Sequence, residues 1–264
     1  MCGIIEMTRK LKTMNSYRKI LLKVRIFLLK NKDSDIKYYL IRNLFRSIYF
    51  LIVNFIGKDF EREFFVVDNL RLVYINNPKT ACSTIKSTLS RKVDREGATP
   101  PAQHLVRSLN KKQLSYFKFT FVRDPYDRLL SCYINKFLQY KERFIYEDYL
   151  MGYLKENDSF EDFVRKVAVI PDTLSDEHFR SQYSILYKNN KLIPDYVGRF
   201  ESLASDFKDI ADKYDLGEFD HINKSSNKEL FIELYTPELI EIVGKRYAKD
   251  FENFGYSKDF LARD

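Results

Sequence analysis

Two segments of this chain each run from a short β-prone stretch through a tight polar turn into a helical pattern. The first covers residues 72–91 and the second covers residues 117–137. Strands that alternate with helices predict an α/β fold with a mainly parallel sheet and helices on both of its faces. In such folds ligands bind beyond the carboxyl ends of the strands. Both turns are therefore expected at one edge of the sheet, and that edge is the candidate site.

The periodicity of the remaining chain predicts the other elements. Strands are expected at Leu72–Ile75 and Phe117–Val122, with a short extended segment at Tyr196–Phe200. Helices are expected over Ser83–Arg91, after Asp124, around 159–168, over 176–188, near 202–214 and near 237–253. Asp124 is expected to cap its helix, with Pro125 at the first helical position. A turn is expected at 220–226.

The N-terminal part of the chain differs from the rest in charge. Residues 1–58 carry 13 Lys or Arg and 3 Asp or Glu, a balance of +10 in a chain whose net charge is +8. Apolar residues at three- and four-residue steps predict basic amphipathic helices here. Two interpretations stay open: peripheral contact with an anionic membrane surface, or a helical cap on the domain. We expect a basic helical segment over 1–60 and the main domain over 61–264.

Composition argues against several classes of protein. The motif-bearing part of the chain is nearly neutral, unlike a domain that reads nucleic acid. Three cysteines and three histidines, at spacings that fit neither a disulfide framework nor a zinc site, predict no metal and a reducing compartment. The apolar stretch 48–56 is about half as long as a membrane span, and the first residues lack the pattern of a signal peptide.

The turn after the first strand, Asn76–Thr84, has the features of an anion site. Unpaired backbone N–H groups and the helix dipole favour an anion at the start of the following helix. Small side chains (Ala81, Ser83) let the backbone approach a phosphate, and Cys82 is a small side chain that the loop can fit. The hydroxyls of Thr80, Ser83 and Thr84 are candidate donors. Lys79 supplies a mobile positive charge. The turn contains no glycine, so it is not a Walker A loop.

The second turn predicts another anion site. Arg123 follows a strand directly, and Ser131 lies about two turns into the next helix. A guanidinium there can grip a phosphate with two hydrogen bonds, and a serine hydroxyl can complete the site. Arg128 is four residues after Asp124, which favours a local salt bridge. Leu129, Leu130, Tyr133 and Phe137 have the spacing of core residues.

Together these segments resemble the carbohydrate sulfotransferases that use 3′-phosphoadenosine 5′-phosphosulfate (PAPS), of the chondroitin, dermatan and HNK-1 type, and their bacterial relatives. The residues that carry the resemblance are Pro78–Thr84, Val122–Tyr133, Asp176–Tyr183 with Ser181 in place of the family's proline, Tyr196–Leu203 and Tyr247–Tyr256. It extends over roughly residues 70–256. The resemblance implies a P-loop-NTPase-like sulfotransferase fold, to which residues 1–60 would add an extra N-terminal helical segment.

The resemblance also implies roles. Lys79 and the amides of the loop Lys79–Thr84 would hold the 5′-phosphosulfate, and Arg123 with Ser131 would hold the 3′-phosphate. Asn223, Lys224 and Ser225 match a loop that approaches the nucleotide in relatives. The product would be 3′,5′-ADP, and the acceptor would be a hydroxyl of a carbohydrate or glycoconjugate.

In-line sulfuryl transfer needs a base for the acceptor hydroxyl, and an unperturbed histidine suits that role. His104 lies between the two phosphate motifs, and His178 lies in the third matched stretch. An acidic residue, or no base at all, is the remaining option.

Two other functions stay open at this point: a P-loop-like kinase acting on a small molecule, and a non-catalytic protein associated with membranes or glycans. Because no anchor or leader pattern is seen, we expect a bacterial cytoplasmic protein that can touch the inner membrane peripherally. The acceptor and the oligomeric state are not specified by the sequence.

Overall fold

The computed structural model describes residues 62–93, 104–139, 153–155, 157–173, 175–217 and 233–260. The predicted basic segment 1–60 lies outside the described residues, and so do Asn223, Lys224 and Ser225 with the turn predicted around them. The domain boundary at residue 60 therefore stays a prediction.

The centre of the domain is a five-stranded sheet in the order β3-β1-β2-β4-β7. Its strands are β1 (Phe64–Val67), β2 (Leu72–Ile75), β3 (Leu105–Val106), β4 (Phe117–Val122) and β7 (Tyr196–Arg199). β2, β4 and β7 pair in parallel, whereas β1 is antiparallel to both β2 and β3. Every strand except β1 therefore runs in one direction, which confirms the predicted α/β fold with a mainly parallel sheet.

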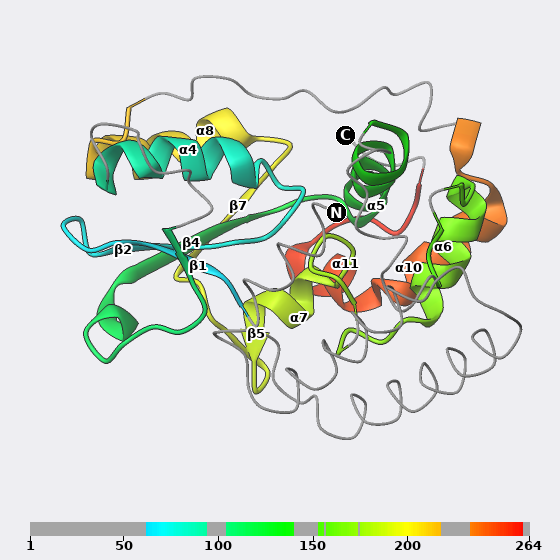
Figure 1. Cartoon of the computed structure of the whole chain (residues 1–264), viewed down its shortest axis with the longest axis horizontal. Coiled ribbons are helices and arrows are strands. Elements are labelled where there is room, and N and C mark those ends of the chain that lie inside the picture. Colours follow the sequence, from blue (N-terminus) through cyan, green and yellow to red (C-terminus); the bar gives the residue numbers. More distant parts are fainter. Residues whose placement is uncertain are drawn as a thin grey trace, which may run out of the picture.

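Side chains alternate between the two faces of the sheet, as the period of a strand requires. Leu72 and Tyr74 of β2 share one core cluster with α4 (Cys82–Val93) and α8 (Leu203–Tyr214). Val73 and Ile75 of the same strand belong to the opposite cluster, which includes residues of α7 (Gln182–Leu186). Figure 1 shows α4 and α8 together on one side of the sheet. Helices thus cover both faces.

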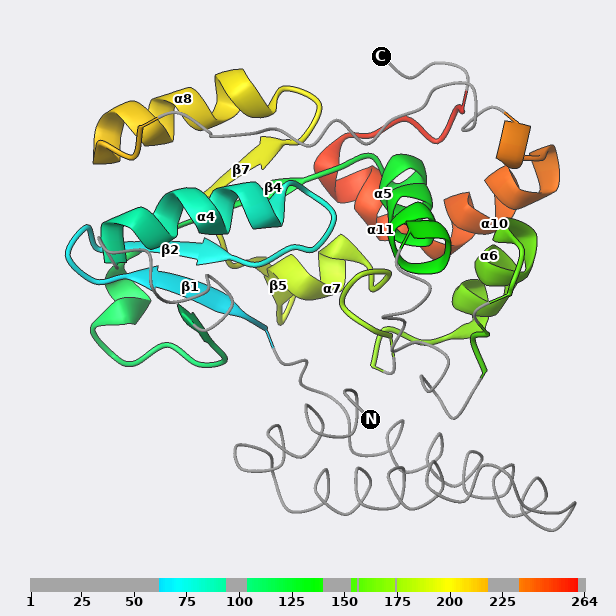
Figure 2. The ribbon, with the colours of Figure 1, turned by 45° about the horizontal axis from the view of Figure 1, so that its top comes forward.

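A separate helical layer lies beyond the carboxyl ends of β2 and β4 (Figure 2). It contains α5 (Pro125–Tyr133), the π-helical turn η4 (Ile134–Gln139), α6 (Phe160–Val169), α10 (Pro237–Arg246) and α11 (Ala248–Phe254). Its core is rich in aromatic rings, among them Tyr133, Phe137 and Phe163. The remaining elements are the 3-10 turn η3 (Gln113–Ser115) and a small hairpin of β5 (Tyr187–Lys188) and β6 (Lys191–Leu192).

Most predicted elements are found, and two are corrected. The helix expected over 176–188 is confined to α7, because residues 176–180 form a turn and Tyr187 begins β5. The helix expected near 237–253 is divided at Tyr247, whose φ of −110° and ψ of 25° leave the helical region. Among the described residues, no helix combines the length and apolar character needed to cross a membrane.

Candidate active site

The loop between β2 and α4 has an unusual backbone conformation. Lys79 and Ala81 both have positive φ, 72° and 62°, although neither is a glycine. Such conformations cost on the order of 1–3 kcal/mol each and persist only where the surroundings enforce them. Left-handed residues next to right-handed ones turn successive N–H groups toward one side, which forms a concave anion site. The strain therefore supports the predicted role of the loop.

Thr80 plays a different part from the one predicted. Its side chain is fully buried, and its hydroxyl donates to the carbonyl of Asn77 at 2.7 Å. The hydroxyl thus closes the loop from within, because its hydrogen is already bonded inside the protein. Ser83 is exposed and Thr84 is half-buried at the start of α4, so their role as hydroxyl donors stays a prediction. Cys82, the first residue of α4, is half-buried as well.

Lys79 is half-buried, and this burial lowers the pKa of its ammonium to about 8. The nearby charges of Lys136 and Arg123 lower the pKa further, while Cys132 and Cys82 oppose them. An ammonium that is short of compensating charge gains most when an anion arrives. The local electrostatics therefore suit a phosphate or a sulfate.

Arg123 leaves the end of β4 and reaches the loop. Its Nη1 donates to the carbonyl of Lys79 at 3.3 Å, and its guanidinium lies 4.1 Å from the ring centre of Phe200. Burial lowers the pKa of this guanidinium, which Asp127, Glu201 and Asp124 counteract. The structure thus brings the two predicted phosphate motifs into direct contact.

The helix after Arg123 is built as predicted. Asp124 caps α5 by accepting from the backbone N–H groups of Tyr126 and Asp127, and Pro125 lies in the first turn. The backbone N–H of Asp124 donates to Glu201 Oε1 at 2.8 Å. Ser131 is buried on the same helix. The helix therefore presents Ser131 from a fixed scaffold.

Arg128 corrects the sequence interpretation. Instead of a salt bridge to Asp124, its guanidinium is buried and donates to three carbonyls: Nε to Pro78 at 3.0 Å, Nη1 to Arg180 at 2.7 Å and Nη2 to Glu177 at 3.0 Å. It therefore joins the loop between β2 and α4 (residues 76–81), the predicted phosphate loop, to the turn 176–180. The spacing of four residues was misleading because the partners are backbone atoms from distant segments.

Two amide side chains missed by sequence reasoning join the same strands. Asn77 Nδ2 donates to the carbonyl of Phe121 at 2.9 Å and to Gln182 Oε1 at 3.0 Å. Gln182 also bonds to the backbone of Arg123. Gln182 lies within a matched motif and Asn77 directly before one, but their spacing in the sequence does not predict that the two side chains meet.

The C-terminal matched stretch supports this arrangement. Asp250 accepts from the N–H groups of Gln182 at 2.9 Å and Tyr183 at 2.7 Å, and burial raises the pKa of its carboxyl to about 6. Tyr247 donates from its hydroxyl to the carbonyl of Phe179 at 2.6 Å. Both residues stabilise the start of α7 and the turn before it.

The two candidate bases lie in unlike surroundings. His178 is half-buried, and its Nδ1 is 2.7 Å from Asp176 Oδ1. Its turn is tied to the phosphate loop through Arg128. His104 packs against Phe65, with ring centres 5.5 Å apart, and its buried Nε2 has no hydrogen-bond partner among the described residues. Within that part of the chain, no cluster of His, Cys, Asp and Glu side chains could hold a metal ion.

Residues 62–257, which include every part of this site within the described ranges, match the sulfotransferase family. The chain belongs to that family. Carbohydrate sulfotransferase 14 of zebrafish (Danio rerio) is 28% identical over 227 residues, 72% of this chain and 61% of that protein. Carbohydrate sulfotransferase 14 of mouse (Mus musculus) is 30% identical over 172 residues, 56% of this chain and 46% of that protein.

Carbohydrate sulfotransferase 11 of rat (Rattus norvegicus) is 27% identical over 176 residues, covering 53% of this chain and 49% of that protein. The matches thus span about half to three fifths of the length of these curated relatives. No solved structure matches the chain. The resemblance of the sequence to this family is therefore confirmed by the comparisons.

Proposed function

We propose that the chain transfers a sulfuryl group from PAPS to a hydroxyl of a carbohydrate or glycoconjugate. The observation that carries the proposal is the hydrogen bond of 3.3 Å from Arg123 Nη1 to the carbonyl of Lys79. It joins two anion sites, one at a helix start and one at a strand end. A nucleotide with phosphates at both its 5′ and 3′ positions has the matching pair of charges.

The residues present fit such a donor. Lys79 and the loop amides suit the 5′-phosphosulfate, and Arg123 with Ser131 suits the 3′-phosphate. In the reaction the bond between sulfur and the bridging phosphate oxygen breaks, and a bond forms between sulfur and the acceptor oxygen. The proton of the acceptor hydroxyl passes to a base, and 3′,5′-ADP leaves. Lys79 would stabilise the charge that grows on the bridging oxygen.

The base is proposed to be a histidine, with one observation for each candidate. Asp176 can orient His178 and stabilise its protonated form, as a carboxylate does for a catalytic histidine. Two features favour His104: it lies between the two motifs in the sequence, and its Nε2 has no hydrogen-bond partner among the described residues. Substituting each by alanine separates them: the true base should lose on the order of a hundredfold or more in turnover with nucleotide affinity intact.

The direct test is sulfate transfer from labelled PAPS to a broad panel of carbohydrate acceptors, read by mass spectrometry. Lys79→Met should reduce transfer by on the order of a hundredfold or more, because it removes the charge at the leaving phosphate. Lys112→Met, in the turn before η3, is a matched control. No transfer by the full chain to any acceptor would refute the proposal.

A kinase would share the strand–loop–helix but not the second phosphate site. Thermal-shift measurements distinguish the two functions, because a ligand stabilises the folded state that binds it. Stabilisation by 3′,5′-ADP and not by ATP supports sulfuryl transfer. The reverse result would favour the kinase.

The setting of the enzyme is a further part of the proposal. We keep the expectation of a cytoplasmic protein whose basic segment 1–60 touches an anionic membrane surface. The relatives named above are vertebrate proteins, so they lend no support to a bacterial origin. Sedimentation of the full chain with anionic but not with neutral vesicles is the expected result, and equal binding to both would exclude electrostatic attachment.

A further inference from the structure

The side chain of Gln182 lies between the two phosphate elements and bonds to both. Its Oε1 accepts from Asn77 Nδ2 at 3.0 Å and from the backbone N–H of Arg123 at 2.9 Å. Its Nε2 donates to the carbonyl of Arg123 at 2.8 Å. Gln182 is fully buried, so it does not meet solvent. One amide thus connects the start of the phosphate loop to the residue that carries the second anion site.

Only a neutral amide supplies this set of bonds. It accepts twice on its oxygen and donates from its nitrogen, which pairs both the N–H and the C=O of Arg123. A leucine of similar volume would leave both of these buried backbone groups without their partner, and a carboxylate would set a negative oxygen against the Arg123 carbonyl. The bonding pattern therefore depends on glutamine at this position.

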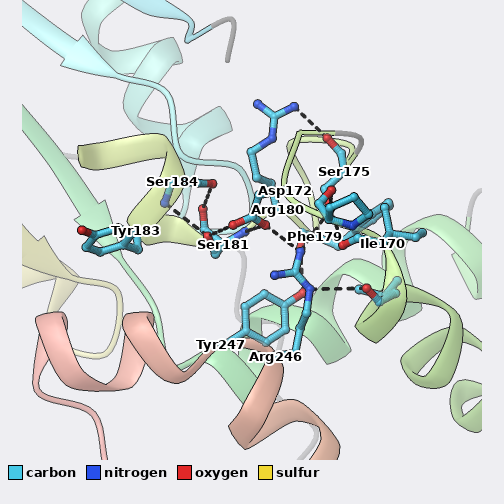
Figure 3. A network of polar contacts seen from close by, with 12 residues as sticks. Ile170, Asp172, Ser175, Phe179, Arg180, Ser181, Tyr183, Ser184, Arg246 and Tyr247 are labelled. Atoms are coloured by element: carbon cyan, nitrogen blue, oxygen red, sulfur yellow. Dashed lines mark hydrogen bonds and ion pairs between the residues drawn. The ribbon is translucent and has the colours of Figure 1, made fainter. Parts of the chain in front are cut away.

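The position of Gln182 is itself fixed from outside the site. Asp250 accepts from its backbone N–H, and Ser181 caps the helix that it begins. Ser181 in turn bonds through its N–H and its hydroxyl to Asp172, which pairs with Arg246 at 2.6 Å. Figure 3 shows Asp172, Ser181 and Arg246 joined in this network. A chain of bonds thus extends from α10 to the phosphate loop.

Ser181 is also where this sequence departs from the family pattern, which has proline there. Proline has no N–H to give to Asp172 and no hydroxyl to cap α7. The bonds from Ser181 to Asp172 therefore use two groups that a proline at this position would lack.

We propose that Gln182 is a positioning residue that couples the phosphate loop to the Arg123 element, so that the two sites bind a 3′,5′-nucleotide as one unit. This inference rests on the proposed function. Gln182 does not touch the nucleotide; it fixes the distance between two groups that do. Its contribution is therefore a coupling free energy, which appears only when both phosphates are present.

The test compares three nucleotides: 3′,5′-ADP engages both sites, whereas 5′-AMP and 3′-AMP engage one each. Dissociation constants are measured by competition for the full-length wild type, Gln182→Leu and Ser184→Ala. Ser184 lies on the same short helix, and its hydroxyl donates to the Ser181 carbonyl. In Gln182→Leu we expect a loss of about tenfold or more for 3′,5′-ADP and about threefold or less for each monophosphate. Ser184→Ala should preserve all three constants.

A second variant covers the case in which Gln182→Leu does not fold. Gln182→Glu keeps the size of the side chain, and its carboxyl can donate to the Arg123 carbonyl only when protonated. Its affinity for 3′,5′-ADP, taken as a ratio to wild type at each pH, should recover as the pH falls from 8 to 6. A ratio that stays constant would contradict the coupling.

The outcomes are distinct from one another. Equal losses for all three nucleotides in Gln182→Leu would reduce Gln182 to a structural residue and overturn the inference while leaving the proposed function intact. Unchanged affinity for 3′,5′-ADP in a folded Gln182→Leu would do the same. Failure of the wild type to bind 3′,5′-ADP would instead remove the proposed function, and the inference with it.

Discussion

The helical layer and the loop end of the sheet are both buried, but with opposite kinds of side chain. In the layer formed by α5, α6, α10 and α11, aromatic and aliphatic residues fill the interior. At the ends of β2 and β4, buried groups are polar or charged, among them Asn77, Thr80, Arg123, Arg128 and Gln182. Each of these polar side chains has a specific partner close by.

This difference has consequences for what substitutions do. An apolar interior is stabilised by volume and area, so a smaller side chain costs stability without moving the site. A polar interior is stabilised by matched donors and acceptors, so the loss of one group misplaces its partners. We therefore expect changes in the helical layer to lower the free energy of unfolding alone, and changes at the loop end to alter ligand affinity as well.

The largest expected effect on stability is that of Phe163→Ala in α6. Phe163 is fully buried, and its ring centre lies 4.8 Å from that of Phe137 and 5.6 Å from that of Tyr133. The cavity should lower the free energy of unfolding by about 4 kcal/mol. Chemical denaturation measures this loss, and the folded fraction should bind 3′,5′-ADP as the wild type does. Val169→Ala, at an exposed position of the same helix, is the control. A weakened nucleotide affinity in Phe163→Ala would break the distinction.

Arg128→Met should lower both the stability of the fold and the affinity for nucleotide, because Arg128 joins the two regions. It removes the donors of three carbonyls and is expected to destabilise the fold by about 3 kcal/mol. Because Arg128 holds Pro78, the affinity for 3′,5′-ADP should fall as well. Arg165→Met is the matched control: Arg165 is exposed and pairs with Glu161 and Glu238 at the surface, where such pairs contribute little. A loss of stability in Arg128→Met with full nucleotide affinity would place Arg128 among the merely structural residues.

The same contrast explains what the sequence could predict. The strands Leu72–Ile75 and Phe117–Val122 and the cap at Asp124 are local features, and all three are found. α5 and the core positions along it followed from helical spacing in the same way. The apolar parts of a fold leave a periodic trace, which is why they can be read before the structure is known.

The polar contacts between distant segments leave no such periodic pattern in the sequence. Arg128 has a carboxylate four residues away, yet it bonds to carbonyls about fifty residues distant in the chain. Thr80 stands among residues that were predicted to bind a ligand, yet its hydroxyl donates to the Asn77 carbonyl inside the protein. The helix expected over 176–188 is shortened because Asp250, from the far end of the chain, and Ser181 fix its start at Gln182. In each case the deciding partner comes from tertiary structure.

The pH dependence of nucleotide binding should be a smaller effect, at the loop end only. Burial lowers the pKa of Lys79 to about 8, so the ammonium is present at pH 7 and is lost as the pH rises through 8. The neighbouring Cys132 stays protonated in this range, because burial raises its pKa to about 12, and Arg123 and Lys136 are the nearby cations. Between pH 7 and pH 9 the affinity for 3′,5′-ADP should fall up to about tenfold.

Titration calorimetry at several pH values measures this fall, together with an uptake of protons on binding. Lys79→Arg supplies the control, because a guanidinium remains charged throughout the interval. Its affinity should change little between pH 7 and pH 9. If wild type and Lys79→Arg showed the same pH profile, some group other than Lys79 would be responsible.

The smallest expected effects concern two hydroxyls, those of Thr80 and Ser83, which should act on different quantities. Thr80→Val removes the bond to the Asn77 carbonyl inside the protein and should lower the free energy of unfolding by about 1 kcal/mol. Ser83→Ala removes an exposed hydroxyl at the start of α4, so it should leave the unfolding free energy unchanged and weaken 3′,5′-ADP binding a few-fold. Denaturation curves and dissociation constants for both variants test this reversal. If Ser83→Ala were the destabilised variant and Thr80→Val lost only affinity, the assignment of inward and outward hydroxyls would be wrong. The loop would then present Thr80 to the phosphosulfate, as its sequence alone suggests.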